Sequence, residues 1–503
     1  MCASSTRGRF ATRFAAGTAL GALSACGGAG PEEPAPVAGQ WPVAVERTDP
    51  NRRDYDRVVL VTIDTLRADH VSCYGYPRQT TPFLDSLAAR GVRFSHAIAA
   101  ASHTAPSHAT MLTGLVPAVH GVLHNGQRLD AGALDLPGLF DASGFECAAF
   151  LNVQFLGGIA GSFGHVHVSK GTATKTEEAE DGADVVDAAL SWLEKERQTE
   201  RFFLWVHLYD PHEWQLRMYQ NEGHQGALWS GATPAGFLER LTELHGLPPP
   251  RPEKPYTVDW GKDRSVVDES LPAFLRAIDE YDELTLFADR QVERLHASIE
   301  ALGLPGRTLW VVTADHGEGL ASHATSGHGP RIYQEQLRVP LVLYASDGSL
   351  VPRVVDELVA HIDLLPTLAE TVGMRVTGNS KLYEGHSLWP LARGESVPWS
   401  GRGIFSQRRP AKDSKESNPS ELYALQTPSA KLIMQGQGTG EFFDLASDPK
   451  ELVDLGSGHA GAAELRAALE ERLRVYRSFS PAGADEEVPE EWMQELRGLG
   501  YVR

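Results

Sequence analysis

Short apolar runs alternate with longer amphipathic stretches along most of the chain. The runs are rich in β-branched and aromatic residues, which favours strands, whereas the longer stretches repeat apolar residues at helical spacing. The predicted strands are 57–63, 146–151, 202–208, 308–313 and 339–344. Helices are predicted from Pro82, from Pro106, over 183–197 and over 274–302. This alternation predicts an α/β fold in which helices sandwich a mainly parallel sheet.

Two regions depart from this alternation. Residues 214–270 contain three tryptophans, a run of prolines and several glycines, and they follow a predicted strand. A long insertion at such a place is either a lid or substrate wall, or a surface excursion without consequence. After about residue 400 the pattern changes to antiparallel strands within 421–434 and 441–445, followed by a helix over 460–477. We therefore expect a catalytic domain over 57–400 and a smaller C-terminal α+β subdomain over 401–503.

Acidic residues follow two of the strongest predicted strands. Asp64 comes directly after the strand 57–63, and Asp315 and His316 come after the strand 308–313. Ligands of open α/β sheets bind at the carboxyl ends of the strands, so these side chains are expected to converge there. Two carboxylates with an imidazole suit Mn²⁺ or Zn²⁺, with Mg²⁺ and Ca²⁺ as alternatives. The pattern predicts one divalent metal ion at this edge of the sheet.

A threonine precedes one of the predicted helices. Thr104 lies two residues before Pro106, and a helix N-terminus favours negative charge. A Thr hydroxyl is a poor nucleophile unless a base or a metal ion activates it. Thr104 can also be an ordinary N-cap, and capping is compatible with catalysis.

The first 25 residues are typical of a bacterial lipoprotein signal peptide. Arg7, Arg9 and Arg13 precede a short apolar stretch, and Leu23-Ser24-Ala25-Cys26 resembles a lipobox. This predicts cleavage before Cys26, a lipid on its thiol, a flexible tether over 26–56, and export to the bacterial cell envelope. An ordinary signal peptide or a disordered start is the alternative.

The formal net charge of −20 argues against nucleic-acid binding, because no basic run or basic-aromatic pattern accompanies it. An acidic protein can still bind an anionic substrate where a metal ion dominates the local field.

The motifs together resemble the sulfatase family of the alkaline phosphatase superfamily. The resemblance extends over about residues 57–455 in the family's order. The stretches that carry it are Ile63–His70, Thr104–Gly114, Asp210–His212, Asp315–Glu318, Gln336–Pro340, Ile362–Thr367 and Phe442–Leu445.

The chain departs from that family at one important position. Sulfatases carry Cys-x-Pro-x-Arg, whose Cys becomes formylglycine, whereas Thr104 and His108 occupy the matching positions here. Threonine cannot yield formylglycine, because its oxidation would give a ketone. We therefore expect the Thr104 hydroxyl to act directly, as in related phosphodiesterases and phosphoethanolamine transferases, and phosphorus esters become more plausible substrates.

The resemblance implies the roles of the remaining candidate residues. His212 matches a histidine that contacts the transferred group and protonates the leaving oxygen, and His328 lies where relatives bind the anion. His108 would contact the substrate or orient Thr104, while His207 and Asp210 are weaker candidates for supporting roles. The implied metal ligands are Asp64, Thr104, Asp315 and His316.

The sequence thus predicts a lipid-anchored, metal-dependent hydrolase of anionic sulfate- or phosphate-type esters with a Thr nucleophile. A phosphodiesterase or phosphonate monoester hydrolase, or a transferase that passes the group to an alcohol, is one alternative. A non-catalytic binding protein on a sulfatase scaffold is the other.

Overall fold

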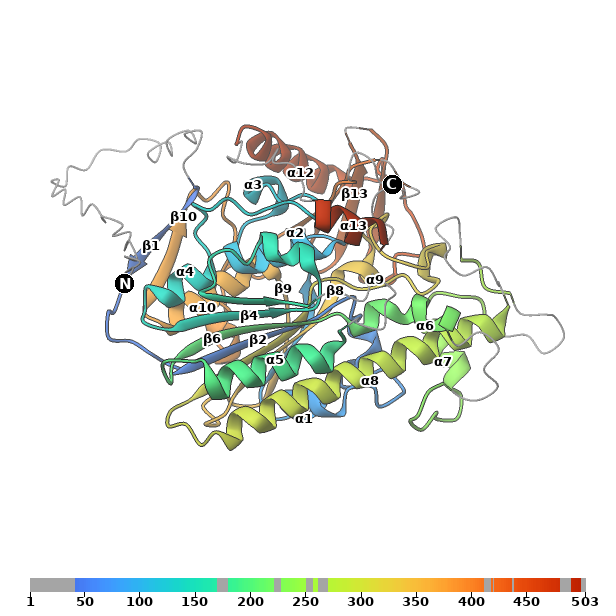
Figure 1. Cartoon of the computed structure of the whole chain (residues 1–503). Helices are drawn as coiled ribbons and strands as arrows, with labels where there is room; N and C mark the ends of the chain where they lie inside the picture. Colours follow the sequence, from blue (N-terminus) through green and yellow to red (C-terminus); the bar gives the residue numbers. More distant parts are fainter. Residues whose placement is uncertain are drawn as a thin grey trace, which may run out of the picture. The chain divides into compact units, whose positions relative to one another are not determined.

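An eight-stranded sheet forms the centre of the fold, in the order β5-β4-β6-β2-β7-β8-β3-β9 (Figure 1). β8 runs antiparallel to β7 and β3, whereas the other neighbours are parallel, so the predicted mainly parallel sheet is confirmed. The strands are β2 (Arg57–Ile63), β3 (Val92–Ile98), β4 (Glu146–Leu151), β5 (His165–Val168), β6 (Phe202–Leu208), β7 (Thr308–Ala314), β8 (Arg338–Ala345) and β9 (Arg353–Ala360).

The computed structural model describes residues 41–498, apart from 170–179, 221–227, 250–256, 261–269, 411–417, 419, 437 and 480–489. The predicted signal peptide, with Cys26, lies outside these residues. The described residues belong to one compact unit. None of the described helices combines the length and the apolar character needed to cross a lipid bilayer.

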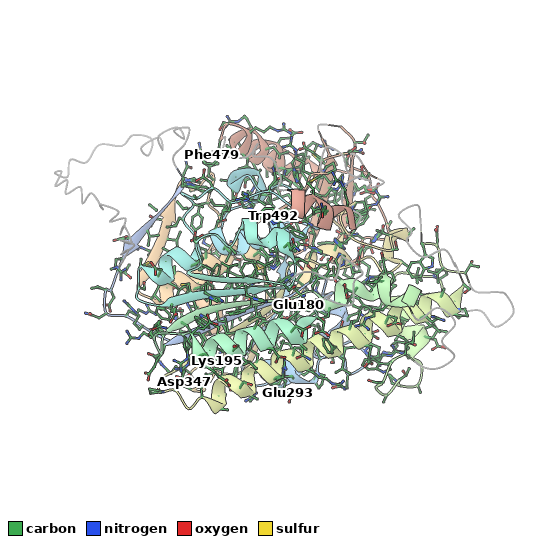
Figure 2. All side chains as sticks on the ribbon, viewed as in Figure 1. Glu180, Lys195, Glu293, Asp347, Phe479 and Trp492 are labelled. Carbon is green, nitrogen blue, oxygen red and sulfur yellow. The ribbon has the colours of Figure 1, made fainter. Side chains whose placement is uncertain are left out.

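Helices cover both faces of the central sheet (Figure 1). One face carries α1 (Pro82–Ala88), α5 (Gly182–Lys195) and α8 (Leu271–Ala301), and the other carries α2 (Thr104–Thr113), α4 (Leu136–Asp141) and α10 (Leu364–Thr371). Every residue of β2, β6 and β7 is buried, which explains why these strands are almost continuously apolar. Polar side chains lie on the outer sides of the helices, as exposed Glu293 of α8 illustrates in Figure 2.

Short helices connect these elements. They are η1 (Ala68–His70), η2 (Ser72–Tyr74), α3 (Pro117–His120), η3 (Gln154–Gly158), η5 (Asp210–Glu213), η6 (Ser322–Ala324), α9 (Gln334–Leu337), η7 (His361–Asp363) and α11 (Trp389–Ala392).

The insertion 214–270 builds a second apolar core beside the main one. It contributes α6 (Trp214–Gln220) and α7 (Phe237–Leu244) among its described residues. Trp214 and Trp260 are fully buried against Phe274 of α8 and Leu320. The described part of the insertion is therefore packed against the loop that follows β7, and it is not a loose surface excursion.

The C-terminal part contains an antiparallel sheet in the order β11-β12-β13-β14, as expected for an α+β subdomain. Its elements are β11 (Ile404–Arg408), β12 (Leu422–Gln426), β13 (Ala430–Gln435), β14 (Gly440–Asp444), α12 (Ala462–Arg477) and α13 (Glu490–Gly498). Trp492 of α13 packs over Gly157 and Gly158 of η3 (Figure 2). The C-terminal part thus joins the same compact unit as the catalytic part.

Two sequence-based boundaries need correction. Residues 43–47 form β1 (Val43–Arg47), which pairs with β10 (Met374–Gly378), so the chain from residue 41 onward is folded and the tether predicted up to residue 56 is too long. The helix predicted to open at Pro106 begins at Thr104, with His103 as its extended N-cap. Thr104 is therefore the first residue of α2 and not the residue before it.

Candidate active site

Three predicted metal ligands meet at the carboxyl ends of two adjacent strands. Asp64 follows β2, while Asp315 and His316 follow β7, and all three side chains are fully buried. One ligand atom from each lies within 4.8 Å of the others. Among the described residues this is the one group of acidic, His or Cys side chains with such spacing.

Thr104 completes this group from the first turn of α2. Its Oγ1 lies 3.5 Å from Asp64 Oδ2 and 3.5 Å from His316 Nε2. Asn125 Oδ1 accepts a hydrogen bond from the amide of Ala105 and so fixes the start of the helix. Residues more than 200 positions apart in sequence therefore converge on one point, as the strand ends predicted.

The backbone around the ligands is held in an unusual conformation. Thr65 has a φ of 55°, and its amide donates to Asp315 Oδ1, as does the amide of His316. The Tyr281 hydroxyl donates to the Thr65 carbonyl oxygen at 2.6 Å. Strain of this kind persists where the surroundings over-determine it. The contacts leave Asp315 Oδ2 aimed into the cluster.

His316 has a defined tautomer. Its Nδ1 lies 3.0 Å from the carbonyl oxygen of Gly317, so Nδ1 carries the proton and donates. Nε2 is then the nitrogen available to a metal ion, and it lies 3.5 Å from Asp315 Oδ2. An imidazole fixed through its other nitrogen is the usual arrangement of a metal-ligating histidine.

The electrostatics of the cluster fit a divalent ion. Asp64 Oδ1 and Asp315 Oδ2 are buried oxygens without a hydrogen-bond partner. Burial and the neighbouring Asp315 carboxylate raise the pKa of Asp64 well above its ordinary value. Burial would also raise the pKa of Asp315, but His316 and His108 outweigh it and lower that pKa. Two buried carboxylates with open lone pairs need a cation, and mixed carboxylate and imidazole donors suit Mn²⁺ or Zn²⁺.

His212 and His328, the two predicted substrate-facing histidines, gather beside His316. The His328 ring centroid lies 4.4 Å from that of His316 and 4.9 Å from that of His212. His212 also stacks on Tyr209 at 4.2 Å. Burial, and then the adjacent His328, lower the pKa of His212 well below its ordinary value. The structure thus brings both residues to the cluster.

Glu318 holds His328, a role that the sequence did not reveal. Its Oε2 lies 3.4 Å from His328 Nδ1 and accepts a hydrogen bond from Trp214 Nε1 at 3.2 Å. Its Oε1 accepts from the amide of Gly319. The Asp-His-Gly-Glu motif contained Glu318, but nothing in sequence indicated that the insertion reaches the site through Trp214.

His108 lies behind Thr104. Its Nδ1 donates to the carbonyl oxygen of Thr104 at 2.8 Å, and its Nε2 lies 2.9 Å from the Thr62 hydroxyl. Burial, together with the nearby His207, lowers the pKa of His108 to about 3. Because protein groups occupy both ring nitrogens, this geometry supports the expected orientation of the nucleophile and not a contact with substrate.

The two weaker candidates, His207 and Asp210, lie in different surroundings. His207 Nε2 lies 3.4 Å from Asp64 Oδ2, and burial lowers the pKa of His207 to about 4. Asp210 instead accepts from the amide of Gly182 at the start of α5, and burial raises its pKa to about 7. His207 therefore belongs to the site, whereas Asp210 anchors a helix.

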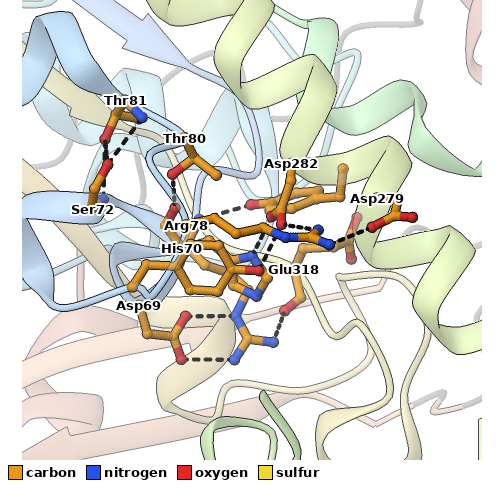
Figure 3. A network of polar contacts seen from close by, with 12 residues as sticks. Asp69, His70, Ser72, Arg78, Thr80, Thr81, Asp279, Asp282 and Glu318 are labelled. Atoms are coloured by element: carbon orange, nitrogen blue, oxygen red, sulfur yellow. Dashed lines mark hydrogen bonds and ion pairs between the residues drawn. The ribbon is translucent and has the colours of Figure 1, made fainter. Parts of the chain in front are cut away.

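A second buried polar cluster joins α8 to the segment 70–78, and we call it the Asp282 network (Figure 3). Asp282 of α8 contacts His70 Nδ1 at 3.0 Å and Arg78 Nη1 at 2.8 Å, and it accepts from the Tyr76 hydroxyl. Arg78 also pairs with Asp279.

Arg67, next to the Asp282 network, holds the backbone that carries Glu318. It pairs with Asp69 through two 2.8 Å contacts, and its Nη1 donates to the carbonyl oxygens of Glu318 and Gly319. Four non-glycine residues just beyond have positive φ: Leu320, Ala321, His323 and Ala324. Arg67 therefore braces this loop through its ion pair with Asp69 and its hydrogen bonds to the two carbonyl oxygens.

Comparisons with known proteins identify the family of the chain. The sulfatase family model matches residues 56–374, and the model of the N-sulphoglucosamine sulphohydrolase C-terminal region matches residues 330–478. The chain is 25% identical over 442 residues to a Delta 4,5-hexuronate-2-O-sulfatase of Bacteroides thetaiotaomicron, covering 82% of this chain and 88% of that protein.

Solved structures show the same fold. A 2-O GAG sulfatase aligns with a TM-score of 0.65 at 22% identity, covering 90% of this chain and 97% of the other. The phosphonate monoester hydrolase of Agrobacterium radiobacter aligns with a TM-score of 0.61 at 19% identity, covering 84% and 95%. The fold and the site define a hydrolase of sulfuric or phosphoric esters. The chain belongs to the sulfatase family.

Proposed function

We propose that this protein is a metal-dependent hydrolase of sulfate- or phosphate-type esters in which Thr104 is the nucleophile. The observation that carries the proposal is the position of Thr104 Oγ1, 3.5 Å from both Asp64 Oδ2 and His316 Nε2. Separations of this size suit atoms that share one ion at about 2.0–2.2 Å each.

Asp64, Asp315, His316 and Thr104 would hold the ion. When bound, it supplies Lewis acidity that lowers the pKa of the Thr104 hydroxyl and neutralises charge on the ester oxygens. Two buried carboxylates without a cation of their own support this assignment. Their charge also gives a reason why an anionic ester would not bind well to the metal-free protein.

Thr104, His212 and His328 would then each carry out a different part of the reaction. The ionised Thr104 oxygen, whose proton has passed to solvent, forms a bond to sulfur or phosphorus while the bond to the leaving oxygen breaks. His212 protonates that oxygen, because an anionic ester beside it favours the imidazolium form. Water then attacks the same centre and releases Thr104. His328, held by Glu318, stabilises the charged oxygens.

Relatives support an anionic ester as the substrate. One aligned structure is described as a complex with D-glucosamine-2-N,6-O-disulfate, and another is a phosphonate monoester hydrolase. Thr104 in place of the formylglycine-forming Cys favours phosphorus esters. A panel of aryl sulfates, phosphodiesters and phosphonate esters would identify the preferred group.

Replacement of Thr104 tests the nucleophile. Thr104→Ala is expected to lose turnover by on the order of 10⁴-fold, whereas Thr104→Ser keeps a hydroxyl and retains part of it. Mass spectrometry of quenched reactions should find the sulfuryl or phosphoryl group on the Thr104 peptide. Turnover of every ester by Thr104→Ala would overturn the proposal, and an added alcohol acceptor would show whether transfer competes with hydrolysis.

A lipid on Cys26 is a further part of the proposal, supported by the lipobox-like Leu23–Cys26 and the preceding basic and apolar segments. In a bacterial host, wild type should incorporate labelled fatty acid and sediment with membranes, and Cys26→Ser should do neither. Equal labelling of the two proteins would refute the anchor.

A further inference from the structure

The insertion brings a polar side chain, Gln215, to the edge of the active site. Gln215 is the second residue of α6 and directly follows Trp214. Trp214 is fully buried in the second apolar core, and its Nε1 donates to Glu318 Oε2 at 3.2 Å. Because both the ring and its nitrogen are held, the first turn of α6 has a defined position beside Glu318.

The turn before α6 places Gln215 on the same side as His212. Residues Asp210–Glu213 form the 3-10 helix η5, and the backbone stays helical at Trp214, where α6 begins. Side chains three residues apart eclipse each other in a 3-10 helix and are neighbours on an α-helix. His212 and Gln215, which are three residues apart, therefore face the same way.

Both side chains also lie against the turn that carries His328. The ring centroids of His212 and His328 are 4.9 Å apart. Gln215 Nε2 lies 3.6 Å from the point that a Cβ atom on Gly327 would occupy, and Glu318 Oε1 lies 3.9 Å from the same point. Gln215 and Glu318 thus flank this turn, and Gln215 stands beside the two histidines that are proposed to act on the ester.

The Gln215 amide is available for a ligand. Its side chain is partly exposed, and none of the hydrogen bonds within the described part of the chain uses it. An amide offers two N–H donors and a carbonyl acceptor, so it matches a hydroxyl group, which also both donates and accepts. The charged oxygens of an ester bind more strongly to charged partners, which leaves the neutral amide for the rest of the substrate.

We propose that Gln215 recognises the alcohol part of the substrate through a hydrogen bond to a hydroxyl group near the ester. The inference rests on the proposed function, in which His212 protonates the leaving oxygen. A side chain that faces the same way as His212 is close to the alcohol to which that oxygen belongs. The chemical class is an alcohol with several hydroxyl groups, such as a sugar or glycerol.

Gln215 is then a specificity-determining residue supplied by the insertion. The proposed metal ligands and Thr104 come from the central sheet and α2, and they act on the sulfur or phosphorus centre. The insertion would thus select the alcohol independently of the group that is transferred. Since the Gln215 side chain is partly exposed, a single neutral hydrogen bond should give a modest selectivity.

Esters that share one acid group but differ in the alcohol test the proposal. The acid group is the one preferred in the panel of esters, carried on glucose, on glycerol or on phenol. Gln215→Leu keeps a similar size and removes the amide. In the metal-loaded full chain, kcat/KM should fall about 3–10-fold for the glucose and glycerol esters and stay within about twofold for the phenyl ester.

Arg217→Leu is the matched control. Arg217 is exposed and lies two residues further along α6, about 200° around the helix from Gln215. This variant should hydrolyse all three esters as wild type does. Equal losses of Gln215→Leu with all three esters would show a purely structural role, and unchanged rates with all three would show no role, so either result overturns the proposal. A loss with only the glucose or only the glycerol ester supports it and identifies the alcohol.

The two proposals fail in different ways. If wild type hydrolyses the three esters and requires Thr104, but Gln215→Leu affects them equally, only the role of Gln215 is lost. If wild type hydrolyses none of them with Mn²⁺, Zn²⁺ or Ca²⁺, the proposed function is lost and this inference with it.

Discussion

The proposed metal site (Asp64, Asp315 and His316) and the Asp282 network are both buried and both contain carboxylates. They differ in whether protein groups compensate the charge of those carboxylates. Asp282 contacts His70, Arg78 and Tyr76, so the protein itself supplies its partners. In contrast, Asp64 Oδ1 and Asp315 Oδ2 have no hydrogen-bond partner. A buried carboxylate needs compensation in either case. The comparison therefore distinguishes a site whose carboxylates need a bound cation from one whose carboxylate is compensated by protein side chains, although the residue types are alike.

Within this comparison of the two clusters, the largest expected effect is on activity and comes from Asp64→Asn. Loss of a metal ligand removes several kcal/mol of charge stabilisation, so kcat/KM should fall by on the order of 10³-fold. In chelator, the free energy of unfolding should stay equal or rise, because burial and Asp315 disfavour the Asp64 carboxylate. Steady-state kinetics and urea unfolding measure both. If Asp64→Asn in chelator were several kcal/mol less stable than metal-free wild type, the Asp64 carboxylate would be compensated by the protein itself, contrary to this account.

The same change in the Asp282 network should act in the opposite direction on stability. Asp282→Asn leaves Arg78 and His70 without their shared carboxylate, so we expect about 3–5 kcal/mol of destabilisation. Asp187→Asn is the control, since its ion pair with Arg294 is exposed and should contribute about 0–1 kcal/mol. Urea unfolding gives the free energy of unfolding of both variants. Equal losses of stability in the two would show that burial of the Asp282 carboxylate does not matter.

A third expected effect depends on pH and concerns His323, which is paired in the manner of Asp282. Its Nδ1 contacts Glu335 at 3.0 Å and its Nε2 donates to the Glu451 carbonyl oxygen. Despite burial, Glu335 raises the pKa of His323 to about 9. Because the folded pKa exceeds the ordinary 6.5, the stabilisation is complete below pH 6.5 and is lost as the pH rises through about 9.

His323→Gln should therefore cost about 2–4 kcal/mol at pH 6 and little at pH 10. Thermal unfolding of both proteins at the two pH values measures the difference. A cost that does not change with pH would show that His323 is neutral in the folded protein.

The smallest expected effect is the response of each cluster to metal. Saturation at 100 times the Kd should stabilise wild type by about 2.7 kcal/mol. Asp282→Asn should gain the same increment, whereas Asp64→Asn should gain much less. Calorimetry with and without Mn²⁺ measures the gain. An equal gain in Asp64→Asn would place the ion elsewhere.

Much of the fold was predictable because strands buried on both faces are almost purely apolar. β2, β6 and β7 were found from that pattern, and the acids after β2 and β7 then located the metal cluster. The strands β3 and β9 were missed, since polar and exposed residues interrupt them. β9 lies at one edge of the sheet, and the partial exposure of both strands weakens their apolar pattern.

The limits at the site have a different cause. Asp64, Thr104, Asp315 and His316 stand in recognisable motifs, whereas the roles of His207 and Glu318 depend on side chains from other strands and loops. Trp214 reaches Glu318 from the insertion, which no local pattern encodes. Contacts between distant segments arise from packing, so the residues that orient the ligands could be assigned only from the structure.

Anomalous diffraction from crystals grown with Mn²⁺ or Zn²⁺ tests the central claim most directly. The account predicts one strong peak at the metal's absorption edge, about 2.0–2.3 Å from ligand atoms of Asp64, Asp315 and His316 and in contact with Thr104 Oγ1. A peak away from this cluster, or a Thr104 oxygen turned away from the ion, would contradict it.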